Sequence, residues 1–118
     1  MANRSTPPQL HDKERELRRE MGSTIREARL NLGLSLQVLA AQIGYRSYRP
    51  VWLIENGRMA IAPEKLPLLE DALRLPPDTL FWKEARCRLF RLGFDVDRIL
   101  DRVEATAPAP PDPAALPV

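Results

Sequence analysis

The sequence predicts an all-α protein. Apolar side chains recur every three to four positions through most of its 118 residues, which is the spacing that gives a helix one buried face. Strand-length runs with alternating apolar and polar residues are missing, and valine, isoleucine and threonine, which favour strands, are few. Glycine, proline and capping residues interrupt the apolar pattern at intervals that predict six helices.

The first helix is predicted over residues 12–31. The first half of this segment is almost wholly charged, and the second half places Ile25, Ala28 and Leu32 at helical spacing. Gly33 follows, and glycine readily adopts the left-handed conformation that ends many helices.

Two short helices are predicted next, over residues 35–43 and 48–56. Ser35 and Ser47 are the expected N-caps, and Pro50 falls in a first turn, where a missing amide costs little. A glycine follows each helix as its stop. The residues expected to face inward are Val38, Leu39, Ala40, Ala41, Ile43, Val51 and Ile54.

Three further helices are predicted, over residues 64–75, 78–92 and 95–105. Two prolines separate the first from the second, Asp78 is the expected N-cap, and Gly93 separates the second from the third. The expected apolar stripes contain Leu66, Leu69, Ala72, Leu73, Val96, Ile99, Leu100 and Val103.

Composition excludes several classes of protein. Charged residues make up 29% of the chain, and no apolar run is long enough for a membrane span or a signal peptide. Cys87 and His11 are the single cysteine and histidine, which excludes an intrachain disulfide and a Cys-rich zinc site. We therefore expect a cytoplasmic protein that is not an enzyme and has no cofactor or metal.

Charge and proline content suggest how the chain is organised. The net charge is only +2, but residues 45–62 carry Arg46, Arg49 and Arg58 against Glu55 alone. We expect a flexible N-terminal segment over 1–11, one helical domain over 12–93, a C-terminal helix over 94–105, and a disordered proline-rich tail over 106–118.

For the basic residues on two of the predicted helices we expect ordinary surface roles. Arg15, Arg18 and Arg19 alternate with glutamates, which favours ion pairs within the helix over a basic arm. The basic residues of the fifth helix are expected to form a solvated face; they are Lys83, Arg86, Arg88 and Arg91.

Residues 22–82 resemble the XRE, or Cro/lambda-repressor-like, helix-turn-helix domain. The resemblance is carried by Gly33-Leu34-Ser35, Leu39-Ala40, Gly44-Tyr45, Val51 and Ile54-Glu55-Asn56-Gly57-Arg58. It implies a five-helix domain whose third helix enters the major groove of double-stranded DNA, while the start of the second helix meets the phosphate backbone.

The resemblance also assigns residues to roles. It implies that the groove-reading residues are Tyr48, Arg49, Trp52 and Leu53, and that the phosphate-binding residues are Ser35, Gln37, Asn56 and Arg58. It further implies a buried ion pair between Arg29 and Glu55. A transcriptional regulator, acting as a repressor on an operator, is the function that follows.

The sequence departs from the family pattern in three ways. Leu36 stands where many members have a phosphate-binding glutamine, and Pro50 stands where a small polar residue is common. Trp52 and Leu53 replace the polar residues usual in the groove. Because aromatic and arginine side chains also dominate protein-binding surfaces, the alternative is a helix-turn-helix domain that binds a protein, as an anti-activator or antitoxin-like regulator does.

The C-terminal apolar residues exceed what a domain of this size needs for its core. They either fold back on the extension of the first helix or form a homodimer, which is the assembly we expect. The residues predicted to dimerise are Leu89, Phe90, Phe94, Ile99, Leu100 and Val103.

Overall fold

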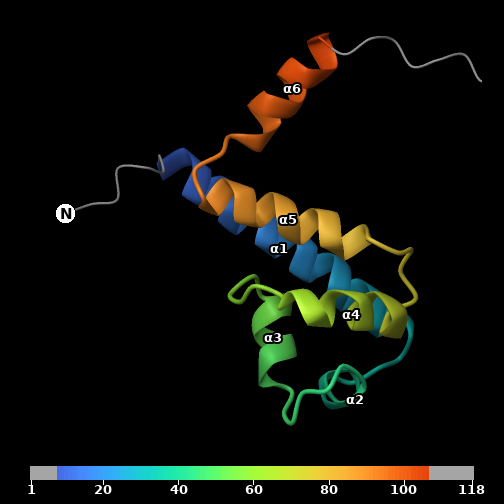
Figure 1. The fold of residues 1–118 in the computed structure, drawn as a ribbon. Coiled ribbons are helices and arrows are strands. Elements are labelled where there is room, and N and C mark those ends of the chain that lie inside the picture. Colours follow the sequence, from blue (N-terminus) through green and yellow to red (C-terminus); the bar gives the residue numbers. More distant parts are fainter. Residues whose placement is uncertain (1–7, 107–118) are drawn as a thin grey trace, which may run out of the picture.

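The computed structural model describes residues 8–106, and every regular element in that range is helical (Figure 1). The all-α prediction is confirmed for this range. The elements are α1 (Pro8–Asn31), α2 (Leu36–Gln42), α3 (Arg49–Glu55), the 3-10 helix η1 (Pro63–Lys65), α4 (Leu66–Ala72), α5 (Thr79–Arg91) and α6 (Val96–Thr106). Residues 1–7 and the predicted tail from 107 onward lie outside the described residues.

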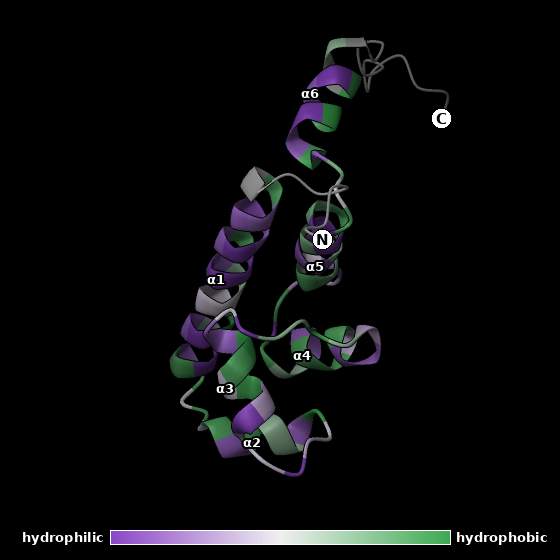
Figure 2. Cartoon of the chain, turned by 90° about the vertical axis from the view of Figure 1, so that its left-hand side faces the viewer, coloured by the Kyte–Doolittle hydropathy of each residue, from purple (hydrophilic) through white to green (hydrophobic). Residues whose placement is uncertain are grey.

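Two long helices form the frame of the molecule. Helices α1 and α5 lie side by side and run in opposite directions, and α2, α3 and α4 gather around the C-terminal half of α1 (Figure 1). Helix α6 projects away from the other helices in both ribbon views (Figures 1 and 2). None of the helices within residues 8–106 has the length and apolar character needed to cross a membrane.

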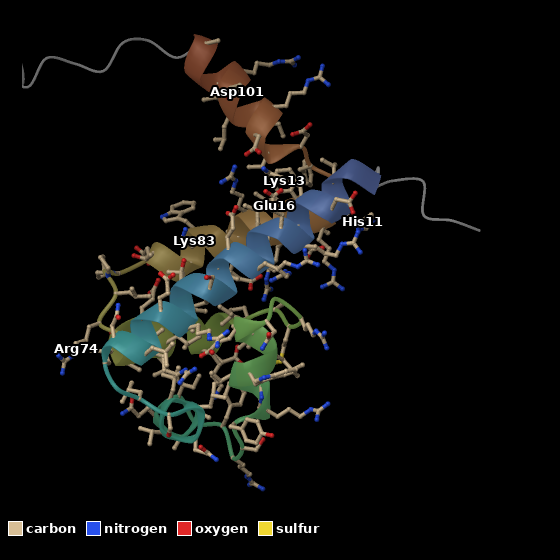
Figure 3. All side chains as sticks on the ribbon, turned by 180° about the vertical axis from the view of Figure 1, so that it is seen from behind. His11, Lys13, Glu16, Arg74, Lys83 and Asp101 are labelled. Atoms are coloured by element: carbon tan, nitrogen blue, oxygen red, sulfur yellow. The ribbon has the colours of Figure 1, made fainter. Side chains whose placement is uncertain are left out.

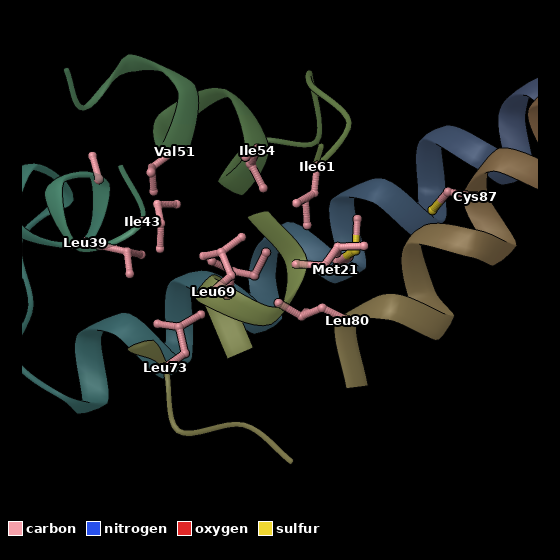
Figure 4. Packing of buried hydrophobic residues seen from close by; sticks show 13 residues of the cluster. Met21, Leu39, Ile43, Val51, Ile54, Ile61, Leu69, Leu73, Leu80 and Cys87 are labelled. Carbon is pink, nitrogen blue, oxygen red and sulfur yellow. The ribbon is translucent and has the colours of Figure 1, made fainter. Parts of the chain in front are cut away.

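The main hydrophobic core lies where the five helices α1 to α5 meet (Figure 4). Each of them contributes at least one fully buried side chain, so the core fixes their relative positions. The largest contributors are Met21, Ile25, Leu39, Ile43, Ile54, Leu69 and Leu80. Most of these residues fall in the apolar stripes that the sequence predicts.

A short turn connects α2 to α3, and one glycine conformation and two hydrogen bonds define its shape. Gly44 has a φ of +86°, a conformation that costs glycine little. The Tyr45 amide donates to the Ala40 carbonyl at 2.9 Å. Lys65 donates through Nζ to the Ile43 carbonyl at 2.8 Å and so satisfies a carbonyl at the end of α2. These contacts orient α3 relative to α2.

The predicted boundaries are wrong at two places. Helix α1 begins at Pro8, so residues 8–11 are not part of a flexible segment. Leu10 is buried there with Phe90 and Val96, which explains why the helix extends this far. The single helix predicted over 64–75 is divided into η1 and the shorter α4.

The inward face of α2 also differs from the prediction. Val38 and Ala41 are exposed, whereas Leu36 packs against the core. At about 100° per residue, Leu36 falls on the same side as Leu39, and Val38 falls on the opposite side. Leu36 therefore faces the core, where the family resemblance suggested a residue facing the phosphate backbone.

Only one of the three predicted N-caps is confirmed. The Ser35 hydroxyl accepts a hydrogen bond from the Val38 amide at 3.1 Å. Ser47 is not the cap of α3, because the helix begins one residue later and Tyr48 occupies the N-cap position without a capping hydrogen bond. Asp78 occupies the N-cap position of α5 with a φ of +69°, and its side chain makes no capping bond.

A glutamate from the preceding helix caps α5 instead. Glu70 is buried in α4, and its Oε2 accepts from the amides of Leu80 at 2.7 Å and Phe81 at 3.3 Å. The carboxylate therefore satisfies free amides at the N-terminus of α5 and places negative charge at the positive end of its dipole.

Candidate nucleic-acid interface

The outer face of α3 carries the residues predicted to read DNA. Val51 and Ile54 point into the core, so the opposite side of this short helix faces outward. Tyr48 is 47% exposed, Trp52 is 39% exposed, and Arg49 is also exposed. Leu53 is half-buried and contributes less to this face than the sequence suggests.

Residues after α3 extend this face beyond the end of the helix. The guanidinium carbon of Arg58 lies 5.8 Å from the centroid of the Trp52 ring, a cation–π contact. The Asn56 side-chain amide donates to the Trp52 carbonyl at 2.8 Å. Two predicted phosphate-binding residues thus lie beside a predicted groove-reading residue.

The other two predicted phosphate-binding residues lie at the start of α2. Ser35 and Gln37 are both exposed, and the Ser35 hydroxyl is already used as a cap. Within residues 8–106, no hydrogen bond joins this pair to the outer face of α3. Ser35 and Gln37 are therefore connected to the outer face of α3 through the turn that orients α3 relative to α2.

The structure contains the predicted ion pair between α1 and α3. Arg29 donates to Glu55 through Nε at 2.7 Å and through Nη2 at 3.1 Å, and both residues are buried. Arg29 also donates through Nη1 to the Leu34 carbonyl at 2.8 Å. This two-bonded pair therefore fixes the last turn of α3 against α1 and the loop before α2.

A second buried carboxylate, which the sequence analysis missed, joins α1, α5 and the loop after α3. Glu84 is 1% exposed and accepts from Arg18 at 3.0 Å, from Arg88 at 2.9 Å and from the Ile61 amide at 2.8 Å. Arg18 also donates to Glu14 at 2.8 Å. Burial by itself lowers the pKa of Arg18, but the hydrogen bonds to Glu84 and Glu14 outweigh it, so the pKa is raised.

This network changes the interpretation of α5. Arg88 donates to both Glu84 and the Ile61 carbonyl, and Arg86 pairs with Asp97 of α6. These two arginines therefore make structural contacts while their side chains remain 43% and 40% exposed, respectively. The signal in the sequence is spacing: Glu84 lies four residues after Leu80 and three before Cys87, on the apolar stripe of the helix.

The predicted dimerisation residues do not all lie on one surface. Phe90 is 1% exposed and packs with Leu10 and Val96, because the early start of α1 brings Leu10 against it. Its assignment to a dimer surface is therefore wrong. The other predicted residues are exposed, and so are Phe81, Trp82 and Leu92. The exposed set is Phe81, Trp82, Leu89, Leu92, Phe94, Ile99, Leu100 and Val103.

The single cysteine lies in the hydrophobic core of the folded protein. Cys87 is fully buried in the main core beside α1, and burial raises the pKa of its thiol to about 11 (Figure 4). We predict that the native protein resists Ellman's reagent near neutral pH, because the thiolate is the reactive form. A colorimetric assay should detect no thiol until denaturant is added; rapid reaction of the native protein would contradict the burial.

Among residues 8–106, His, Cys, Asp and Glu side chains form no group of three or more that could hold a metal ion. Comparisons of the chain with protein-family models, with curated proteins and with solved structures found no match.

Proposed function

We propose that this protein is a sequence-specific DNA-binding transcriptional regulator in which α2 and α3 form a helix-turn-helix and α3 enters the major groove. The observation that carries the proposal is the outer face of α3. It presents Tyr48, Arg49 and Trp52 to solvent, while its inner face is locked to the core by Val51 and Ile54 and to α1 by Glu55. A rigid helix with an exposed arginine and aromatic residues supports a recognition role.

Each exposed residue has a chemistry that suits this role. Arg49 can donate two hydrogen bonds to guanine, and Trp52 can pack on a thymine methyl group. Arg58 and Asn56 are positioned beside Trp52 to contact the phosphate backbone, and Gln37 at the start of α2 can do the same. Bound in this way to an operator, the protein would act as a repressor.

A homodimer is part of the proposal. An apolar groove of about 270 Å³ runs between α5 and α6, and Trp82, Leu89 and Leu100 are among the residues that line it. A two-fold dimer formed through this surface would carry two copies of α3, one for each half-site of a palindromic duplex.

In-vitro selection from random duplex DNA tests the proposal. We expect enrichment of a palindrome whose half-sites lie about 10 base pairs apart.

Arg49→Ala should relax the preference at one base pair of each half-site by about 1–3 kcal/mol, because it removes a base contact. Arg58→Ala should instead weaken binding to all sequences alike, because it removes a phosphate contact.

Fluorescence anisotropy with the selected duplex and with a scrambled duplex separates the two effects. If Arg49→Ala binds the selected site as tightly as the unaltered protein does, the assignment of α3 to the groove is wrong.

A second candidate function rests on the exposed indole of Trp52. Tryptophan and arginine, here joined by the cation–π contact with Arg58, are enriched in protein-binding hot spots. On this alternative α3 binds a protein partner, and the domain is an anti-activator or antitoxin-like regulator. Selection at low salt that enriches no sequence would favour it over DNA recognition.

A further inference from the structure

We infer that Arg15 and Arg19 of α1, together with Arg58 after α3, bind a backbone phosphate of the DNA duplex. The inference rests on the proposed function and extends it. Both α1 residues precede position 22, so they lie outside the segment that resembles helix-turn-helix domains. The DNA interface would then include the extended first half of α1.

The three arginines line one pocket of about 410 Å³, together with Asn56 and Gly57. Arg15 and Arg19 lie one turn apart on the same face of α1. The loop after α3 packs directly on this face, since a β-carbon added to Gly57 would lie 3.0 Å from Arg19 Cγ. Gly57 also has a φ of +71°, so glycine permits both the turn and the close approach.

The pocket holds positive charge without a matching carboxylate. All three arginines are exposed, and no acidic side chain lines the pocket. Among the described residues, Arg19 and Arg58 have no ion-pair partner, and Arg15 pairs only with exposed Asp12. An exposed pair of this kind contributes little, so Arg15 can exchange it for another anion.

Neighbouring Arg18 shows the contrast. Its side chain turns to the interior and is bonded to Glu14 and Glu84, so it has no role in the pocket. Arg18 is therefore neutralised by these carboxylates, whereas Arg19 has no ion-pair partner among the described residues and Arg15 pairs only with exposed Asp12. Arginines that line one pocket with few counter-charges favour a phosphate, which accepts several of their hydrogen bonds at once.

Continuity with α3 identifies the source of the phosphate. Arg58 lines the pocket and also contacts the Trp52 ring on the outer face of α3. A duplex seated on Trp52 would pass this pocket with its backbone, so one phosphodiester group is the occupant. A free phosphate compound has the same chemistry, and the experiment separates the two sources.

The test measures the salt dependence of duplex binding by the full chain and by the Arg15→Gln/Arg19→Gln double variant. A generic duplex is titrated by fluorescence anisotropy between about 0.05 and 0.3 M salt. Loss of one phosphate contact should make the slope of log affinity against log salt less negative by about 0.9 and weaken binding roughly 8-fold at about 0.1 M salt.

Arg74→Gln is the control, because it makes the same Arg→Gln change at one exposed arginine that does not line the pocket. Arg74 lies at the opposite end of the molecule from His11 and Lys13, which mark the first turns of α1 (Figure 3). The control should retain the slope of the unaltered protein. Circular dichroism and thermal midpoints should show that every variant folds as the unaltered chain does.

Three results would overturn the inference, and they are distinguishable. If the unaltered protein binds duplex DNA and the double variant shows the same slope, α1 is outside the interface and the proposed function stands. If the unaltered protein binds no duplex at low salt, both proposals fail. A thermal midpoint that rises with millimolar inorganic phosphate only when Arg19 is present, together with an unchanged DNA slope, would assign the pocket to a free phosphate compound.

Discussion

Glu84→Ala is expected to destabilise the protein by about 5 kcal/mol, a large share of the free energy of unfolding of a small domain. The substitution leaves buried Arg18 with Glu14 as its remaining partner and deprives the Ile61 amide of its acceptor. Removing one partner of a buried ion pair costs about 3–5 kcal/mol, of which the remaining bond to Glu14 offsets part, and an unsatisfied amide adds about 1–3 kcal/mol. Urea denaturation followed by circular dichroism measures the loss.

Two comparisons identify the cause of the loss. Glu27→Ala removes an exposed glutamate from α1 and should change stability by less than about 0.5 kcal/mol. Glu84→Met and the double variant Arg18→Met/Glu84→Met then separate charge from packing. The double variant should be more stable than Glu84→Met alone, since it also removes the buried guanidinium that has lost its two hydrogen bonds to Glu84; if it is less stable, the loss of these bonds by Arg18 is not the reason.

The helices could be predicted because their signals are local. Apolar spacing places Ile25, Leu39-to-Ile43 and Val51-to-Ile54 on buried faces, and glycine marks the ends of α1, α2 and α3. The start of α1 could not be found in the same way. Its first turn is ordered by Leu10 packing against Phe90, a contact between residues far apart in the sequence.

The buried carboxylates show a second limit of sequence reasoning. Glu55 could be paired with Arg29 through the family resemblance, and the pair is present. Glu70 and Glu84 have no such guide. Their roles depend on amides and arginines that tertiary packing brings to them, namely the first turn of α5 for Glu70 and Arg18 with the Ile61 amide for Glu84.

The candidate site could be predicted only in part, because one part of it is assembled by tertiary packing. The family resemblance implied that Tyr48, Arg49 and Trp52 face outward from the third helix, and all three are exposed in the structure. The basic pocket could not be predicted, because it combines Arg19 of α1 with Arg58 of a loop that packs against α1 at Gly57 only after folding. In sequence, Arg15, Arg18 and Arg19 look alike, and their different partners appear only after folding.

Gly22→Ala is expected to destabilise the protein by about 3 kcal/mol, the upper end of the usual cost of overpacking and against the usual preference for alanine in a helix. In an exposed helix interior this change stabilises by about 1 kcal/mol. Here Gly22 is buried where α1 crosses the end of α3, and an added β-carbon would lie 2.4 Å from the Glu55 carbonyl oxygen and 2.6 Å from that of Ile54. Those atoms are backbone, so the clash is relieved only by moving α3 away from α1.

The displacement connects stability to recognition. Moving the end of α3 strains the Arg29–Glu55 pair and shifts the face that presents Trp52, so the Gly22→Ala protein should also bind its selected duplex more weakly than Arg74→Gln does. Ser23→Ala, at the adjacent exposed position of α1, should leave both stability and DNA affinity nearly unchanged. Thermal denaturation and anisotropy measure the two quantities. A higher thermal midpoint for Gly22→Ala would mean that α1 and α3 do not pack this closely, and the rigid support proposed for the recognition helix would be lost with it.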